Sequence, residues 1–122
     1  MSDSKNLFNE AYERLNNAKY LYDGERYNLS VSESYYTMFY GAKALIALKN
    51  LNSKTHSGVM NLFSLNYVHD ADFNPNTARL YFRAEQKRIN ADYDVIINYD
   101  YKRAKKAIKN VEEFLKECEK FF

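Results

Sequence analysis

The sequence predicts an all-α protein, an up-and-down bundle of four long helices with one short additional helix. Three glycines and one proline are the only strong helix breakers in 122 residues, and helix interiors disfavour both residue types. Apolar residues recur at three- and four-residue spacing, and no segment sustains the two-residue alternation of a half-buried strand. Long helices joined by short connections pack as antiparallel neighbours, which favours a bundle.

Length and composition favour a single domain that spans residues 1–122, because the chain is too short to form two hydrophobic cores of adequate size. One cysteine, Cys118, excludes an internal disulfide and a thiolate metal site, which agrees with a reducing compartment. The sequence has no apolar run of membrane-spanning length and no signal-peptide layout, so we expect a cytoplasmic protein without a membrane partner. The formal charge of +2 does not indicate any particular partner.

The first helix is expected over residues 6–22, where an apolar stripe keeps the helical period. Its members are Leu7, Ala11, Leu15, Ala18 and Tyr22. Asp23 and Gly24 follow directly, so we expect Gly24 to end the helix in the left-handed conformation that glycine adopts without steric cost.

The second helix should carry most of the core and run from within residues 28–32 to Lys49, with Asn28 or Ser30 as its N-cap. One of its stripes is expected to be buried and consists of Tyr35, Met38, Phe39, Ala42, Leu45 and Ile46. A second stripe contains Tyr36, Tyr40 and Lys43. This second stripe indicates either a core contact or a surface for another subunit or a ligand.

Two capping residues mark the next helices. Thr55 is expected to cap a short helix that carries Val59, Leu62, Phe63 and Tyr67. Asn74 is expected to cap a long helix over residues 75–97, with Pro75 at its first position.

The break at residues 98–100 is weak by composition, which leaves open a nearly continuous connection to the last helix. That helix has the cleanest apolar stripe in the chain, composed of Ala104, Ile108, Val111, Leu115, Cys118 and Phe122. Cys118 is therefore interpreted as a small core residue.

Arg88 interrupts an otherwise small and apolar stripe of the long fourth helix, between Ala84 and Ala91. An inward arginine needs a partner, and Asp92 lies one turn later at i+4. One interpretation is an ion pair that fixes the helix register. The other is a guanidinium directed into a cleft to hold phosphate. Tyr93 adjoins the pair, chiefly as a packing residue and also as a candidate substrate contact.

His56 stands at the predicted start of the short helix, next to Lys54 in sequence. The amide groups of a helix start beside a lysine favour anion binding, and a histidine with a pKa near neutrality can act as a general base. The plainer interpretation is a surface or capping histidine. His69 is assigned no role, and two histidines do not support a zinc site.

The last helix has a basic stripe of Lys102, Lys105, Lys106 and Lys109, with Arg103 nearby. Such stripes are usually solvated faces, and Glu112 and Glu113 dilute this one. Salt-sensitive contacts to RNA phosphates are the functional alternative.

Three blocks of the chain together resemble the HEPN domain family, and in particular its small stand-alone prokaryotic branch. They are SYYTMFYGAKAL at 34–45, KTHSGV at 54–59, and Arg88 followed by Ala-Asp-Tyr at 91–93. The resemblance implies a helical bundle that forms homodimers. It also implies a metal-independent ribonuclease site between subunits, built from an arginine and a histidine several residues later on one helix, and frequent pairing with a small nucleotidyltransferase in toxin–antitoxin modules.

Carried over by residue, Arg88 matches the family's arginine, but no histidine follows it on that helix. If RNA is cleaved, we expect Arg88 to stabilise the phosphorane charge, Asp92 to orient Arg88, and His56 to act as acid or base without metal or cofactor. Candidate substrate contacts are Tyr36, Tyr40, Lys43, Lys54 and Tyr93.

Two further functions stay open at this stage. A family member without the motif histidine could bind RNA without cutting it, or serve as a non-catalytic adaptor for a small nucleotidyltransferase through the Tyr36 and Tyr40 stripe. A structural subunit of a larger assembly, without RNA affinity, is the third interpretation.

Overall fold

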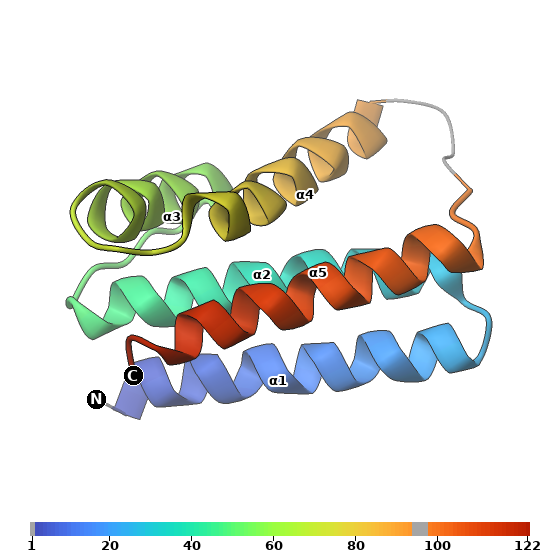
Figure 1. Cartoon of the computed structure of the whole chain (residues 1–122), viewed down its shortest axis with the longest axis horizontal. Helices are drawn as coiled ribbons and strands as arrows, with labels where there is room; N and C mark the ends of the chain where they lie inside the picture. Colours follow the sequence, from blue (N-terminus) through green and yellow to red (C-terminus); the bar gives the residue numbers. More distant parts are fainter. Residues whose placement is uncertain (1, 94–97) are drawn as a thin grey trace.

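The computed structural model describes the backbone of residues 2–93 and 98–122, and the side chains of residues 3–88 and 98–122. Its elements are α1 (Ser2–Asp23), α2 (Tyr27–Leu48), α3 (His56–Phe63), the π-helical segment η1 (Ser64–His69), α4 (Pro75–Tyr93) and α5 (Tyr101–Glu119). The four long helices alternate in direction, and α2 and α5 lie between α1 on one side and α3 with α4 on the other (Figure 1). The described residues contain no strand, so the predicted all-α bundle is confirmed.

Helix α2 is the centre of the bundle, because it contacts α1, α3, α4 and α5. Its predicted inner stripe is buried throughout, at Tyr35, Met38, Phe39, Ala42, Leu45 and Ile46. Gly41 lies on the side of α2 that faces α5, where a Cβ would sit only 3.0 Å from Leu115 Cδ2. The absence of a side chain at this position therefore allows the two helices to approach closely.

The end of α1 differs from the prediction, because none of the three glycines has a positive φ. The left-handed residue is Glu25, with φ of 63°. The N–H of Arg26 donates to the Leu21 carbonyl at 2.8 Å and that of Glu25 to the Tyr22 carbonyl at 3.0 Å. This is the paired bonding of a Schellman helix end, shifted one residue beyond Gly24.

Neither Asn28 nor Ser30 caps α2, which begins at Tyr27, so this prediction was wrong. Ser30 is buried, and its hydroxyl donates to the Ala18 carbonyl of α1 at 2.7 Å. The Asn28 side chain accepts a hydrogen bond from the Tyr99 N–H at 2.8 Å. Both polar side chains thus satisfy groups on neighbouring segments instead of the helix start.

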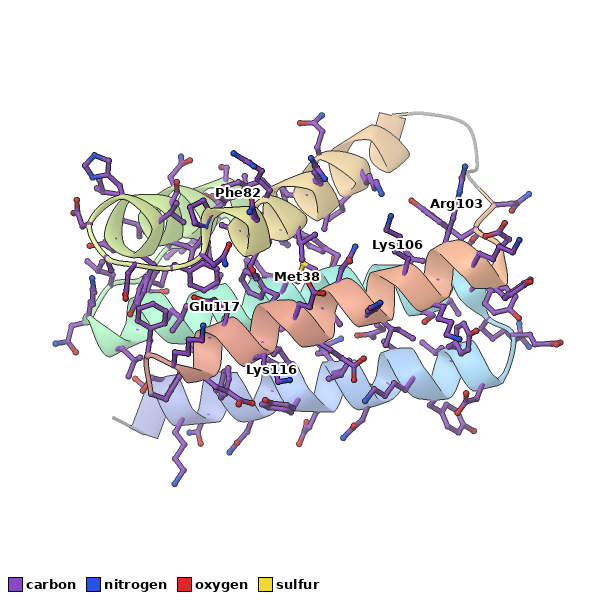
Figure 2. The ribbon with its side chains drawn as sticks, in the orientation of Figure 1. Met38, Phe82, Arg103, Lys106, Lys116 and Glu117 are labelled. Carbon is purple, nitrogen blue, oxygen red and sulfur yellow. The ribbon has the colours of Figure 1, made fainter. Side chains whose placement is uncertain are left out.

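The other two predicted caps are confirmed. Thr55 Oγ1 accepts from the Gly58 N–H at 3.0 Å, and Asn74 Oδ1 accepts from the Asn76 N–H at 2.9 Å. Glu117 of α5 accepts from the Asn74 N–H at 3.1 Å, which ties the start of α4 to the end of α5 (Figure 2).

Helices α4 and α5 are antiparallel neighbours, so a nearly continuous pair is excluded (Figure 1). Asp100 is extended and its side chain accepts from the Arg103 N–H at 2.9 Å, which starts a new helix. The predicted helix end at 97 lies outside the described residues. The α5 stripe is buried through Cys118, whereas Phe122 is 49% exposed and stacks on Phe8.

Replacing Gly41 by valine should lower the free energy of unfolding by about 1–3 kcal/mol, because the added methyl groups would separate α2 from α5. Urea unfolding followed by circular dichroism measures this change. Gly24→Ala is the matched control, since a Cβ there meets only backbone oxygens at 3.6 Å or more. Equal effects of the two substitutions would contradict the close approach.

Candidate functional site

Five side chains from three helices converge where α2, the start of α3 and α4 meet, and we call this group the Glu85 cluster. They are Tyr35, His56, Tyr81, Glu85 and Arg88. Tyr35 belongs to the inner stripe of α2, and the Thr55 cap starts α3 at His56. Tyr81, Glu85 and Arg88 follow at i, i+4 and i+7 along α4, which places them on one helix face.

Glu85 lies at the centre of the cluster and is only 2% exposed. Arg88 Nη2 donates to Glu85 Oε1 at 2.8 Å, and Arg88 Nε lies 3.4 Å from Oε2. The Tyr35 hydroxyl lies close to this carboxylate. Burial opposes ionisation, but the hydrogen bonds from Arg88 and the nearby Tyr35 hydroxyl hold the pKa of Glu85 below its ordinary value. The carboxylate is therefore charged at neutral pH.

Glu85 is a partner of Arg88 that the sequence reasoning missed. Asp92 was predicted at i+4, but its side chain and that of Tyr93 lie outside the described residues. The structure pairs Arg88 with Glu85 at i−3. The same three-or-four-residue spacing rule that selected Asp92 would have selected Glu85, had the preceding turn been searched.

His56 joins the cluster through Tyr35, whose Oη lies 2.6 Å from His56 Nδ1. The imidazole stacks on the Phe39 ring, with centroids 4.4 Å apart, and meets the edge of Tyr36. Burial lowers the pKa of His56, and the positive charge of Arg88 lowers it further. The imidazole is therefore neutral at physiological pH, as a general base must be.

Arg88 retains access to the solvent, because 28% of its side chain is exposed. Its guanidinium carbon lies 5.3 Å from the centroid of the Tyr35 ring, within cation–π range. The sequence predicted Arg88 and His56 separately, and the structure brings both to one cluster. Tyr35 connects the two residues, because its hydroxyl lies 2.6 Å from His56 Nδ1 and its ring contacts the Arg88 guanidinium.

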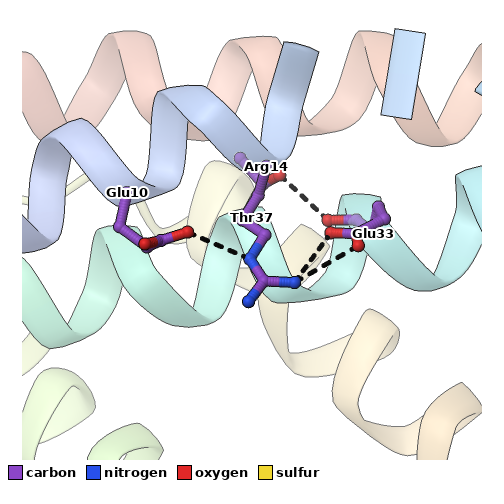
Figure 3. A network of polar contacts seen from close by, with 4 residues as sticks. All are labelled: Glu10, Arg14, Glu33 and Thr37. Atoms are coloured by element: carbon purple, nitrogen blue, oxygen red, sulfur yellow. Dashed lines mark hydrogen bonds and ion pairs between the residues drawn. The ribbon is translucent and has the colours of Figure 1, made fainter. Parts of the chain in front are cut away.

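The predicted aromatic stripe of α2 contacts α1. Arg14 lies 5.9 Å from the Tyr36 ring centroid and 5.5 Å from that of Tyr40. Two carboxylates, those of Glu10 and Glu33, bind this arginine at 3.2 Å each (Figure 3). The stripe is half-buried and therefore has both an intramolecular partner and an accessible side.

The two lysines predicted as substrate contacts, Lys43 and Lys54, lie in different parts of the structure. Lys43 is half-buried, with its ammonium 5.7 Å from the Phe39 ring centroid, and thus adjoins the cluster. Lys54 is exposed in the loop before α3. The basic stripe lies on the exposed side of α5, as the sequence predicted, with Arg103 and Lys106 on its first half (Figure 2).

Among the described side chains, no group of three His, Cys, Asp or Glu residues is arranged to hold a metal ion. One hollow lies between α1 and α5 and another around Phe8, Leu48 and Phe121, and neither is lined by a residue of the Glu85 cluster. Within the Glu85 cluster, Tyr35, Tyr81 and Glu85 are buried, whereas His56 and Arg88 are partly exposed. None of the described helices combines the length and apolar character needed to cross a membrane.

The chain is similar in sequence to a known domain family and to several named proteins. The model of the HEPN domain matches residues 4–121. A Methanocaldococcus jannaschii protein named "Putative toxin" is 31% identical over 115 residues, which cover 94% of this chain and 78% of that protein. A Thermotoga maritima "UPF0332 protein" is 33% identical over 110 residues, covering 90% and 83%. A second M. jannaschii "Putative toxin" is 37% identical over 87 residues, covering 71% and 65%.

Glu85→Gln should destabilise the protein at neutral pH by about 1–3 kcal/mol, because Arg88 loses a charged acceptor. The depressed pKa of Glu85 means that its ionised form stabilises the fold above the ordinary value of 4.5. This contribution is lost as pH falls through the lower folded-state pKa. The difference from the wild type should therefore shrink in acid, as measured by urea unfolding at a series of pH values.

The control for this series is Glu113→Gln, which removes one exposed carboxylate from α5. We expect a small difference from the wild type throughout the series. A Glu85→Gln difference that does not change with pH would contradict the charged, buried carboxylate.

Proposed function

The chain belongs to the HEPN domain family, and on that premise we propose that it is a metal-independent ribonuclease of a toxin–antitoxin or defence-type module. The connected path from His56 to Arg88 is the observation that carries this proposal, because it joins a neutral base to a phosphate-binding cation. Two relatives named as toxins support the type of module. We further propose that residues 1–122 form one HEPN domain and that it acts in the cytoplasm.

In the proposed reaction, His56 accepts the proton of a ribose 2′-hydroxyl. The 2′-oxygen attacks the adjacent phosphorus, the bond from phosphorus to the 5′-oxygen breaks, and the departing oxygen takes up a proton. Arg88 stabilises the charge that develops on the phosphoryl oxygens. Tyr36, Tyr40, Lys43, Lys54 and Tyr93 are proposed as RNA contacts, and Asp92 as a second residue that orients Arg88.

This assignment differs from the active family pattern, in which the histidine follows the arginine on one helix. Here no histidine follows Arg88 on α4. The 2.6 Å contact between Tyr35 Oη and His56 Nδ1 supports His56 of α3 as its replacement. The imidazole therefore reaches the site from a different helix.

We also propose a homodimer in which the cluster of each subunit lies in the cleft between them. The partial exposure of His56 and Arg88 supports this, because a second copy would cover these two side chains and exclude water.

A non-catalytic adaptor that pairs with a small nucleotidyltransferase is the second candidate function. The observation that favours it is the ion pair itself, because Glu85 balances the charge of Arg88. In that case the half-buried stripe of Tyr36 and Tyr40 would provide the contact surface.

Purified protein should cleave a total tRNA pool in the presence of EDTA, and Arg88→Ala or His56→Ala should lower the rate about 100-fold or more. Gel electrophoresis of the RNA measures the rate. The rate should rise as pH increases through the pKa of His56, which lies below its ordinary value of 6.5. His69→Ala is the matched control, because His69 lies away from the cluster beside Asp70. A folded dimer without any cleavage would favour the adaptor.

Light scattering at micromolar concentrations should give the mass of a dimer. A monomer throughout that range would contradict a site shared between subunits.

A further inference from the structure

We infer that Glu85 competes with the RNA phosphate for Arg88, and that the hydroxyl of Tyr81 donates to the Glu85 carboxylate when a phosphate binds. Glu85 and Tyr81 are then positioning residues, which act on RNA only through Arg88. This inference rests on the proposed function, in which Arg88 holds a phosphate of the RNA. It follows from the geometry of the ion pair and from one buried hydroxyl on the same helix face.

The ion pair occupies one of the two edges through which an arginine binds a phosphate. Arg88 Nη2 donates to Glu85 Oε1 at 2.8 Å, and Arg88 Nε lies 3.4 Å from Oε2. These two nitrogens form a fork that fits a carboxylate or a phosphate in the same paired geometry. A phosphate that binds this fork must displace Glu85. A phosphate at the other edge would share the positive charge of Arg88 with the carboxylate, so Glu85 opposes binding there as well.

The two members of the pair differ in their access to solvent. The Arg88 side chain is 28% exposed, whereas that of Glu85 is 3% exposed. Arg88 can therefore turn towards a ligand in solution, while Glu85 stays inside the protein. A buried carboxylate that loses its cation needs another donor, because an unpaired buried charge is costly. The exchange thus requires a second donor within the protein.

Tyr81 has the properties of that donor. It precedes Glu85 by four residues on α4, so the two side chains lie one turn apart on the same helix face. Tyr81 is fully buried, and its hydroxyl has no hydrogen-bond partner in the described part of the chain. Burial and the nearby charge of Glu85 raise the pKa of Tyr81, so the hydroxyl keeps its proton at physiological pH. Donation to Glu85 would remove the cost of a buried hydroxyl without a partner.

The site therefore has two states. Without RNA, Glu85 accepts from Arg88, and the Tyr81 hydroxyl has no partner among the described residues. With RNA, Arg88 donates to the phosphate and Tyr81 donates to Glu85. The phosphate replaces the carboxylate as an acceptor, and the hydroxyl replaces the guanidinium as a donor. Neither charge is left unsatisfied, and the hydroxyl lowers the cost of opening the ion pair.

Fluorescence anisotropy with a labelled single-stranded oligonucleotide that lacks 2′-hydroxyls tests this exchange, because such a ligand binds but is not cleaved. Glu85→Gln removes the competing charge and should raise the affinity about tenfold, which corresponds to one hydrogen bond to a charged group. Tyr81→Phe removes the second donor and should lower the affinity about fivefold, which corresponds to one neutral hydrogen bond.

Tyr81→Phe also separates the exchange from a structural role. The Tyr81 hydroxyl has no partner among the described residues in the free protein, so its removal should not lower the free energy of unfolding in urea. We expect weaker binding by a protein of unchanged stability, which a merely structural role does not produce. This variant decides the question if Glu85→Gln does not fold.

Two control variants match these substitutions. Glu117→Gln removes another buried carboxylate with a cation at i+3, Lys120 at 2.7 Å, and should leave the affinity unchanged. Tyr67→Phe removes a buried tyrosine hydroxyl that donates to the Leu45 carbonyl. This second control should lower the stability without changing the affinity.

Three results would overturn the inference: an affinity that Glu85→Gln does not raise, an affinity that Tyr81→Phe does not lower, or no binding by the wild type and Glu85→Gln alike. The measurement involves no cleavage. If the proposed nuclease function fails, RNA stays intact while the two variants still change the affinity in opposite directions. If this inference fails, the affinity does not follow Glu85 and Tyr81, whether or not RNA is cleaved.

Discussion

The buried carboxylate of Glu85 is the constraint on which the site depends. A charge removed from water is costly unless other groups solvate it, and here Arg88 does so at both carboxylate oxygens, with the Tyr35 hydroxyl nearby. Arg88 belongs to α4 and Tyr35 to α2, so the two helices must pack in the register that brings both groups to Glu85. His56 is then fixed through Tyr35 and its stack on Phe39. Packing of the bundle and geometry of the cluster are therefore set by the same contacts.

The position of His56 depends on the hydrogen bond and the close packing at the start of α3. Thr55 accepts a hydrogen bond from the Gly58 N–H, which fixes where the helix begins and hence where His56 lies. A Cβ on Gly58 would sit 1.9 Å from Ser53 Oγ. Only glycine allows the loop before α3 to fold this closely over the helix start. The site thus combines a rigid part on α2 and α4 with a histidine positioned by a capped short helix.

The sequence alone was sufficient to predict the structural features that depend on hydrophobic periodicity and on local helix capping. The inner stripe of α2 and the caps Thr55 and Asn74 were predicted correctly, because each follows from spacing within one segment. Arg88 and His56 were singled out by their residue types, but their common location depends on how α3 packs beside α4. Glu85 was missed because the sequence does not show that this carboxylate is buried. The left-handed residue was placed one position early, at Gly24, because composition favours glycine there, whereas the backbone uses Glu25.

In the proposed complex, RNA binds with a phosphate at Arg88 and a ribose 2′-position at His56. The most direct test is an NMR titration with an RNA oligonucleotide whose 2′-hydroxyl is replaced by hydrogen, which binds but cannot be cleaved. We predict concentration-dependent shifts of the His56 imidazole and Arg88 Nε–H signals, with His69 unaffected. Shifts confined to the exposed lysines of α5, with the signals of His56 and Arg88 unchanged, would contradict the claim and place RNA on the last helix.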